Sequence, residues 1–339
     1  MEMRTDRPSA MRTFRRAAVT GVGAYVPERC VRNEDLIQFP AATIPLIRQK
    51  TGVEARHYAA DGESTSDLGA AAALRCLNNA GVRAADVDAI ILSTSSPDRI
   101  QPPTAARVQV LIGATRAAAF DLNAVCAGSV FALQMADALI RSERYETVLV
   151  VAAEVYSRFL NPRDFATMPY FGDGAGALLL ESSTDPERGV CRTLLRTDGS
   201  GWDTIAIRAG GAMLPHSAVT NPADNFFSMR GREVYDFAVS KGSEIVSELL
   251  AETGIAIDQV AAVVAHQANR NVLEVIAART GIPFARFPIT LNRYGNTASA
   301  SVLIGLEHAC SSGSVKVGDY VVLVAFGGGL SWGASLICL

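Results

Sequence analysis

The segment AGSVFAL at residues 127–133 decides the fold of this chain. It has the composition of a helix, and none of its side chains carries a charge. A helix that is apolar on every face must be covered on every face, so it belongs to an inner layer. The segment therefore predicts the middle layer of a five-layer sandwich. Residues 118–122 have the pattern of a strand, which places Cys126 between that strand and the start of the buried helix.

The second half of the chain repeats the first at a constant offset of 173 residues, as from Gly81 to Gly254. Both glycines follow an amphipathic helix, where glycine suits the C-cap. Three further pairs coincide at the same offset: the apolar strands 87–93 and 260–266, the helices 126–140 and 299–313, and the strands 146–151 and 319–324. One offset shared by four elements predicts an α/β fold, an α-β-α-β-α sandwich made of two pseudo-symmetric halves.

The boundaries follow from breaks in this pattern. Residues 1–16 are polar and arginine-rich with no apolar core after them, so we expect a disordered leader and no signal peptide. The turn-forming stretch SSTDPERG at residues 182–189 divides a first half, 17–185, from a second half, 186–339. Residues 209–228 are rich in Gly, Pro and Asn and predict a loop near a site.

Composition excludes several classes of function. The 339 residues carry a net charge of −3, so no basic field supports nucleic-acid binding. The apolar runs have strand length and are too short to span a membrane. Six scattered cysteines show neither metal-ligand spacing nor a disulfide framework, which predicts a reducing, cytoplasmic setting and no metal site.

Three residues are candidates for catalysis, and each also has an ordinary structural interpretation. Cys126 begins the buried helix, where free N–H groups and the helix dipole stabilise a thiolate, but a lone cysteine is often only a packing residue. His266 ends a strand, where α/β folds place their sites, and Asn296 precedes the second buried helix. Either could be a structural histidine or a helix cap. The repeat favours function because it brings the two helix starts to a shared centre.

Two glycine-rich segments complete the candidate site. Residues 327–329 follow a strand, and an N–H group there could form an oxyanion hole with the N–H of Cys126. GDGAG at residues 172–176 lacks the Lys-Ser/Thr pair of a nucleotide-binding loop and the spacing of a dinucleotide fingerprint.

Together these motifs resemble the β-ketoacyl-acyl carrier protein synthase III family of the thiolase superfamily. The resemblance runs from about residue 17 to the C-terminus. It rests on these segments, in order: DLNAVCAGSVFAL (121–133), FGDGAGA (171–177), HQAN (266–269), NRYGNTASAS (292–301) and AFGGGLSWG (325–333).

The resemblance implies a two-step reaction without a metal or redox cofactor. Cys126 would take an acyl group from a thioester of coenzyme A or acyl carrier protein, with N–H groups of Cys126 and Gly328 holding the oxyanion. His266 and Asn296 would bind a malonyl thioester and stabilise the enolate left after loss of CO₂. Attack of the enolate on the acyl-cysteine gives a β-ketoacyl thioester. The resemblance also implies a homodimer, with Phe171 and Phe326 at the substrate site.

The chain departs from the family at the positions that select substrates. The Trp and Arg that grip coenzyme A at the tunnel mouth correspond to Leu46 and Phe165, and a Phe that limits the partner's acyl pocket corresponds to Pro102. The positions that dock acyl carrier protein fall near Asp236 and Asn271. These changes argue against housekeeping fatty-acid initiation and favour specialised metabolism.

Three other functions stay open from the sequence. The same fold could move the acyl group to a hydroxyl or amine, with His266 as a general base. A cysteine hydrolase would need an orienting group for His266. A non-catalytic partner subunit should lack the nucleophile, and the presence of Cys126 argues against it.

Overall fold

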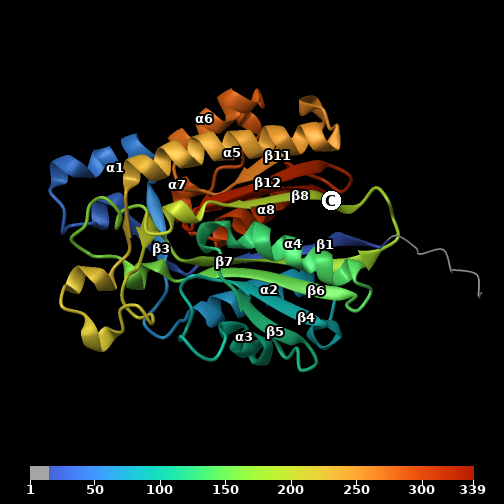
Figure 1. The fold of residues 1–339 in the computed structure, drawn as a ribbon, viewed down its shortest axis with the longest axis horizontal. Helices are drawn as coiled ribbons and strands as arrows, with labels where there is room; N and C mark the ends of the chain where they lie inside the picture. The colour runs from blue at the N-terminus through green and yellow to red at the C-terminus, as the bar shows by residue number, and fades with distance from the viewer. Residues whose placement is uncertain (1–14) are drawn as a thin grey trace, which may run out of the picture.

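Two β-sheets lie one above the other, with helices between them and on both outer faces (Figure 1). The computed structural model describes residues 15–339. Residues 1–14 of the expected leader lie outside this range. Arg16 already belongs to the first strand, so the boundary at residue 16 is one residue too late.

The first sheet has five strands that run mostly parallel at its centre. β4 pairs in parallel with β5 and β6, whereas β7 runs antiparallel to β6 and β1. The order across the sheet is β1 (Arg16–Tyr25), β7 (Gly174–Ser183), β6 (Thr147–Glu154), β4 (Ala89–Ser93) and β5 (Ala118–Leu122).

The second sheet repeats this order with four strands: β8 (Gly189–Thr197), β13 (Ser331–Cys338), β12 (Tyr320–Gly327) and β11 (Val260–Ala265). The loop at residues 184–188 links β7 of the first sheet to β8 of the second. Two further antiparallel sheets have only two strands each: β2 (Arg29–Arg32) with β3 (Ala55–Tyr58), and β9 (Ile205–Ala206) with β10 (Ser228–Met229).

The helices form the other three layers. α4 (Gly128–Arg141) and α8 (Ala300–Ser311) fill the middle layer and contact strands of both sheets. α2 (Thr65–Ala80) and α3 (Thr104–Ile112) cover the first sheet from outside, and α5 (Gly231–Thr253) with α6 (Arg270–Thr280) covers the second (Figure 1). Of the two short helices, α1 (Ile44–Thr51) contacts α6 and α7 (Leu291–Tyr294) contacts β3.

The middle layer explains the apolar segment that predicts the fold. Val130, Ala132 and Leu133 of α4 are fully buried. Val302 and Leu306, near the equivalent places of α8, are fully buried as well. Side chains from both sheets close over them in one core. The expected five-layer thiolase-like sandwich is confirmed. Within residues 15–339, no helix combines the length and hydropathy needed to cross a bilayer.

Candidate active site

Cys126 is presented by a sharp turn between β5 and α4. Val125 has a positive φ of 48°, which is strained for a β-branched residue. Asn123 stabilises this turn, since its Oδ1 accepts a hydrogen bond from the N–H of Val125 at 3.0 Å. A single 3₁₀ turn, Val125–Ala127, then leads into α4. The turn places the thiol at the start of the buried helix.

A cavity of about 140 Å³ brings the three catalytic candidates together, because Cys126, His266 and Asn296 all line it. Cys126 comes from the first half and the other two from the second. Most of the remaining wall is apolar, including Phe171, Phe227, Val234, Phe237, Val272 and Phe326. The roles of the three residues stay predictions, but their shared cavity is a direct feature of the structure.

His266 is buried and neutral. Its Nδ1 lies 2.7 Å from Oγ of Ser301, a hydroxyl that also accepts a hydrogen bond from the N–H of Gln267 at 3.2 Å. Burial lowers the pKa of His266 to about 4, against an opposing contribution from the Ala298 backbone. A serine hydroxyl both donates and accepts, so the contact fixes the ring while permitting the proton on Nε2.

Asn296 has a defined orientation. Its N–H donates to the carbonyl of Tyr170 at 2.8 Å, and its carbonyl accepts from the N–H of Gly172 at 3.0 Å. Its side-chain Oδ1 accepts from the N–H of Ala298 at 2.9 Å. Since that N–H can only donate, the oxygen of the amide must face it, which leaves the NH₂ group available to a ligand.

Cys126 rests as a thiol. Burial raises its pKa, and the nearby carboxylate of Glu154 acts in the same direction. The stabilisation of a thiolate at the helix start stays a prediction, and the helix dipole would have to offset this cost of desolvation. The thiol must lose its proton during the reaction.

The glycine loop that follows β12 lies directly against Cys126. A Cβ atom at Gly327 would fall 2.8 Å from both Cβ and N of Cys126, so only glycine allows this approach. At the adjacent Gly328, a Cβ would make ordinary contacts of 3.4 Å with Ile205 and Val125. The N–H of Gly328 stays a predicted oxyanion donor.

Three aromatic rings form one wall beside Cys126. Tyr156 and Phe171 stack with centroids 5.2 Å apart, and Phe227 packs edge-on against both. Phe171 was among the predicted substrate-binding residues. The sequence pattern missed Tyr156 and Phe227, although Phe227 lies in the loop at 209–228 that pointed to a nearby site.

The structure separates the other predicted substrate-binding residues. Phe326 lines the cavity with Cys126. Phe165 packs edge-on against Phe39 with centroids 5.1 Å apart, and Leu46 lies in α1. Pro102 borders a different surface hollow. None of these last three reaches the cavity within this chain, so their roles at the tunnel mouth and toward a partner subunit stay predictions.

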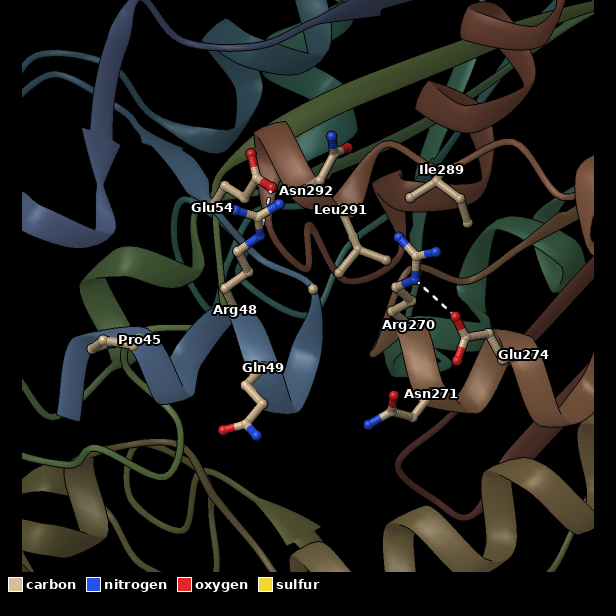
Figure 2. Close-up of a pocket in the computed structure, with 11 residues that line it drawn as sticks. Pro45, Arg48, Gln49, Glu54, Arg270, Asn271, Glu274, Ile289, Leu291 and Asn292 are labelled. Carbon is tan, nitrogen blue, oxygen red and sulfur yellow. Dashed lines mark hydrogen bonds and ion pairs between the residues drawn. The ribbon is translucent and has the colours of Figure 1, made fainter.

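A polar groove of about 570 Å³ lies next to the cavity, between α1 and α6 (Figure 2). Arg48 stands on one side, paired with Glu54 at 3.0 Å, and Arg270 on the other, paired with Glu274 at 2.8 Å. Thr51 and Asn269 line the cavity, and their sequence neighbours Gly52 and Arg270 line the groove, so the two spaces lie close together.

The GDGAG segment has a structural role. The carboxylate of Asp173 is buried and accepts hydrogen bonds from the N–H of Ala59 and from the N–H and hydroxyl of Ser157. Gly176 lies so close to Leu303 of α8 that a Cβ would come within 2.5 Å of the leucine Cβ. The motif thus packs β7 against the middle layer.

Comparisons with known proteins agree with this fold and site. The model of 3-oxoacyl-[acyl-carrier-protein] synthase III matches residues 120–199, and that of its C-terminal region matches residues 250–339. The chain is 41% identical over 325 residues to a beta-ketoacyl-[acyl-carrier-protein] synthase III of Rhodospirillum centenum, covering 95% of this chain and 98% of the relative.

Solved structures give the same result. A 3-oxoacyl-(acyl carrier protein) synthase III of Pseudomonas aeruginosa superposes with a TM-score of 0.89 at 34% identity, covering 95% of this chain and 98% of that one. A priming β-ketosynthase of the R1128 polyketide biosynthetic pathway superposes with a TM-score of 0.89 at 31% identity, covering 98% and 99%.

The fold and the cysteine-containing cavity define a thiolase-like acyltransferase. Within that class, the chain belongs to the β-ketoacyl-[acyl-carrier-protein] synthase III family.

Proposed function

We propose that this enzyme catalyses the decarboxylative condensation of an acyl thioester with a malonyl thioester, through an acyl group carried on Cys126. The observation that carries the proposal is the pair of neutral donors that line the same cavity as the thiol. His266 Nδ1 meets a serine hydroxyl and no carboxylate, so a protonated imidazole would lack a counter-charge. Asn296 offers its NH₂ group. Such donors suit an enolate, which needs no base to form when CO₂ leaves.

The first step moves the acyl group to sulfur. Cys126 attacks the thioester carbonyl, and N–H groups of Cys126 and Gly328 hold the developing oxyanion. When the tetrahedral intermediate collapses, the carbon–sulfur bond to the carrier breaks. The thiol proton of Cys126 ends on the departing thiolate, so this step leaves no charge on the enzyme.

The second step makes the carbon–carbon bond. The malonyl carbonyl accepts hydrogen bonds from Nε2–H of His266 and the amide of Asn296. The bond to the carboxylate breaks, CO₂ leaves, and its electron pair forms the enolate. The enolate carbon attacks the acyl-cysteine, the bond to sulfur breaks, and a β-ketoacyl thioester departs. A proton taken up from solvent then restores the thiol of Cys126.

The shape of the site supports a small acyl group and carrier-bound substrates. The cavity of about 140 Å³ is lined by the rings of Phe171 and Phe227, and Tyr156 stacks on Phe171. The outer groove with Arg48 and Arg270 suits the phosphate groups of coenzyme A or of a carrier protein's prosthetic group (Figure 2). We propose that the enzyme works as a cytoplasmic homodimer and requires no metal or redox cofactor.

Single substitutions separate the two steps. The Cys126→Ala variant should lose acyl loading, because it lacks the sulfur. The Asn296→Ala variant should load normally and release CO₂ from a malonyl thioester about a hundredfold more slowly, the usual effect of losing one donor to an oxyanion. Loading is read from the mass of the peptide that contains residue 126, after incubation with a panel of acyl-coenzyme A thioesters. The exposed Cys30 provides a matched control, since Cys30→Ala should load like the wild type.

The result also tests the alternatives. Acyl loading followed by transfer to an alcohol or amine, without CO₂ release, would replace the condensation by simple acyl transfer. Loading followed by release of free acid would indicate a hydrolase. A wild-type enzyme that accepts no acyl group from any donor would refute the proposal.

A further inference from the structure

The three catalytic candidates have counterparts in the other half of the chain. At the offset of 173 residues these counterparts, here called the mirror set, are Ser93 for His266, Asn123 for Asn296 and Ser299 for Cys126. The correspondence is structural as well as numerical, since β4 aligns with β11 and α4 with α8.

Both halves build the same strained turn before the middle-layer helix. Ala298 has a φ of 46°, close to the 48° of its counterpart Val125. In each turn an asparagine Oδ1 accepts the N–H two residues on, at 2.9 Å for Asn296 and 3.0 Å for Asn123. The second turn therefore presents Ser299 as the first presents Cys126.

The side chains around the two turns differ in one decisive way. The offset pairs Glu154, at the end of β6, with Gly327, at the end of β12. Gly327 leaves room for Cys126. Glu154 instead extends a carboxyl group to the mirror set, where its Oε1 accepts a hydrogen bond from the hydroxyl of Ser299 at 2.6 Å.

Glu154 is fully buried in a cage of donors. Its carboxyl group accepts hydrogen bonds from the N–H and hydroxyl of Ser95 and from the hydroxyls of Ser96 and Thr94, all in the first half. Among the hydrogen bonds described for residues 15–339, only that from Ser299 links this carboxyl to the second half. Burying the carboxyl group of Glu154 costs free energy, because the group loses its contact with water. Packing alone does not explain why a carboxyl group lies there.

Ser299 lies between the two residues that orient the donors of the candidate site. The N–H of Ala298, one residue before, fixes the amide of Asn296. The hydroxyl of Ser301, two residues after, holds the ring of His266. An anchor on Ser299 therefore sets the position of both donors.

We propose that Glu154 is a positioning residue for decarboxylation: through Ser299 it holds the strained turn at Ala298 and the start of α8, and thereby aims Asn296 and His266 at the malonyl carbonyl. The inference rests on the proposed function for its catalytic consequence, whereas the anchoring itself is a property of the folded chain. Cys126 has its own turn and its own helix, so acyl loading does not depend on this anchor.

The first test measures the anchor without any substrate. Backbone hydrogen exchange of peptides covering residues 295–303 is followed by mass spectrometry in the full-length protein. We expect exchange about tenfold faster in Ser299→Ala and Glu154→Ala, because each removes the 2.6 Å hydrogen bond between Ser299 and Glu154. Ser299→Ala also removes the longer contact of 3.4 Å between the Ser299 hydroxyl and the carbonyl of Ser93. Glu154→Gln should exchange like the wild type, since its side-chain oxygen still accepts from Ser299. Ser129→Ala is the matched control, because Oγ of this buried serine has no hydrogen-bond partner among the described residues.

The second test measures the two chemical steps in the same variants. In Ser299→Ala, CO₂ release from malonyl-coenzyme A by the acyl-loaded enzyme should fall by about ten- to a hundredfold. Loading of Cys126 from the acyl-coenzyme A that the wild type accepts should stay within about threefold. Glu154→Gln should restore CO₂ release. A purely structural defect would lower both steps together.

Unchanged exchange at residues 295–303 in both Ser299→Ala and Glu154→Ala overturns the proposal, and so does an equal loss of loading and CO₂ release in Ser299→Ala. If Glu154→Ala fails to fold, Ser299→Ala carries both tests. If the wild type releases no CO₂ from malonyl-coenzyme A, the proposed function fails on that result, and hydrogen exchange alone then confirms or refutes the anchor.

Discussion

At the residue scale, Gly327 shows how the absence of one side chain shapes the candidate site. Its counterpart in the first half is Glu154, so the same backbone position carries a carboxyl group in one half and only hydrogen in the other. A Cβ at Gly327 would lie 2.8 Å from the backbone nitrogen of Cys126, a contact that only movement of the main chain could relieve.

The Gly327→Ala variant should therefore displace the turn that carries Cys126. We expect acyl loading to fall by about a hundredfold, the usual effect of moving a reacting group by about 1 Å. Single-turnover loading, read as the mass of the peptide with residue 126, measures it. Gly199 is the matched control, because a Cβ there meets no atom within 4 Å. Loading of Gly327→Ala at the wild-type rate would contradict the close approach.

His266 gives the second prediction at this scale, which concerns pH. Burial lowers its pKa from 6.5 to about 4, so between these values the unfolded chain binds a proton that the folded chain does not. Its neutral form therefore adds stability that is complete above about pH 6.5 and is lost as the pH falls toward 4. The full contribution is on the order of 3 kcal/mol.

Replacing this histidine should flatten that part of the stability profile. The free energy of unfolding, from urea titrations at pH 7, 6 and 5, should decrease less on acidification in His266→Asn than in the wild type. His216 is exposed and shows no comparable burial, so His216→Asn should follow the wild-type profile. Parallel profiles for His266→Asn and the wild type would show that the ring titrates normally.

At the element scale, the repeat in the sequence predicts most of the fold. Strands β6 and β12 begin and end at the same offset of 173 residues, and so do the first residues of β1 and β8. The apolar strands and the middle-layer helices can be predicted from local runs of apolar residues, and these runs occur in both halves. Cys126, His266 and Asn296 were identifiable because they stand at the ends of such elements.

The repeat fails where local sequence and tertiary contacts disagree with it. The offset carries β5 onto residues 291–295, yet the structure has the short helix α7 there. The side chain of Gln267 accepts hydrogen bonds from the N–H groups of Thr290 and Leu291, and Gly295 ends the helix at a positive φ. The second sheet consequently has four strands. Such a contact, like the ring cluster around Tyr156, arises only when distant segments meet.

At the scale of the whole molecule, the first sheet ends at β5. This strand pairs with β4 on one side, and no other strand of residues 15–339 pairs with its outer edge. Phe120 in β5 is 37% exposed, and Val110 of the adjacent α3 is 74% exposed. An open edge with apolar side chains is a surface that soluble proteins normally cover. We therefore expect a second copy of the chain to pair with it, which gives the proposed homodimer.

A charge on this edge should separate the two copies. Light scattering after gel filtration should give the wild type twice the chain mass of 35.9 kDa, and Phe120→Lys the mass of one chain. Val317, equally apolar and 76% exposed but placed in the turn before β12, is the matched control, so Val317→Lys should stay dimeric. A wild type with the mass of one chain would refute the dimer. If Pro102 borders the partner's acyl pocket, the separated chains should also load longer acyl groups than the dimer, because the pocket has lost that wall.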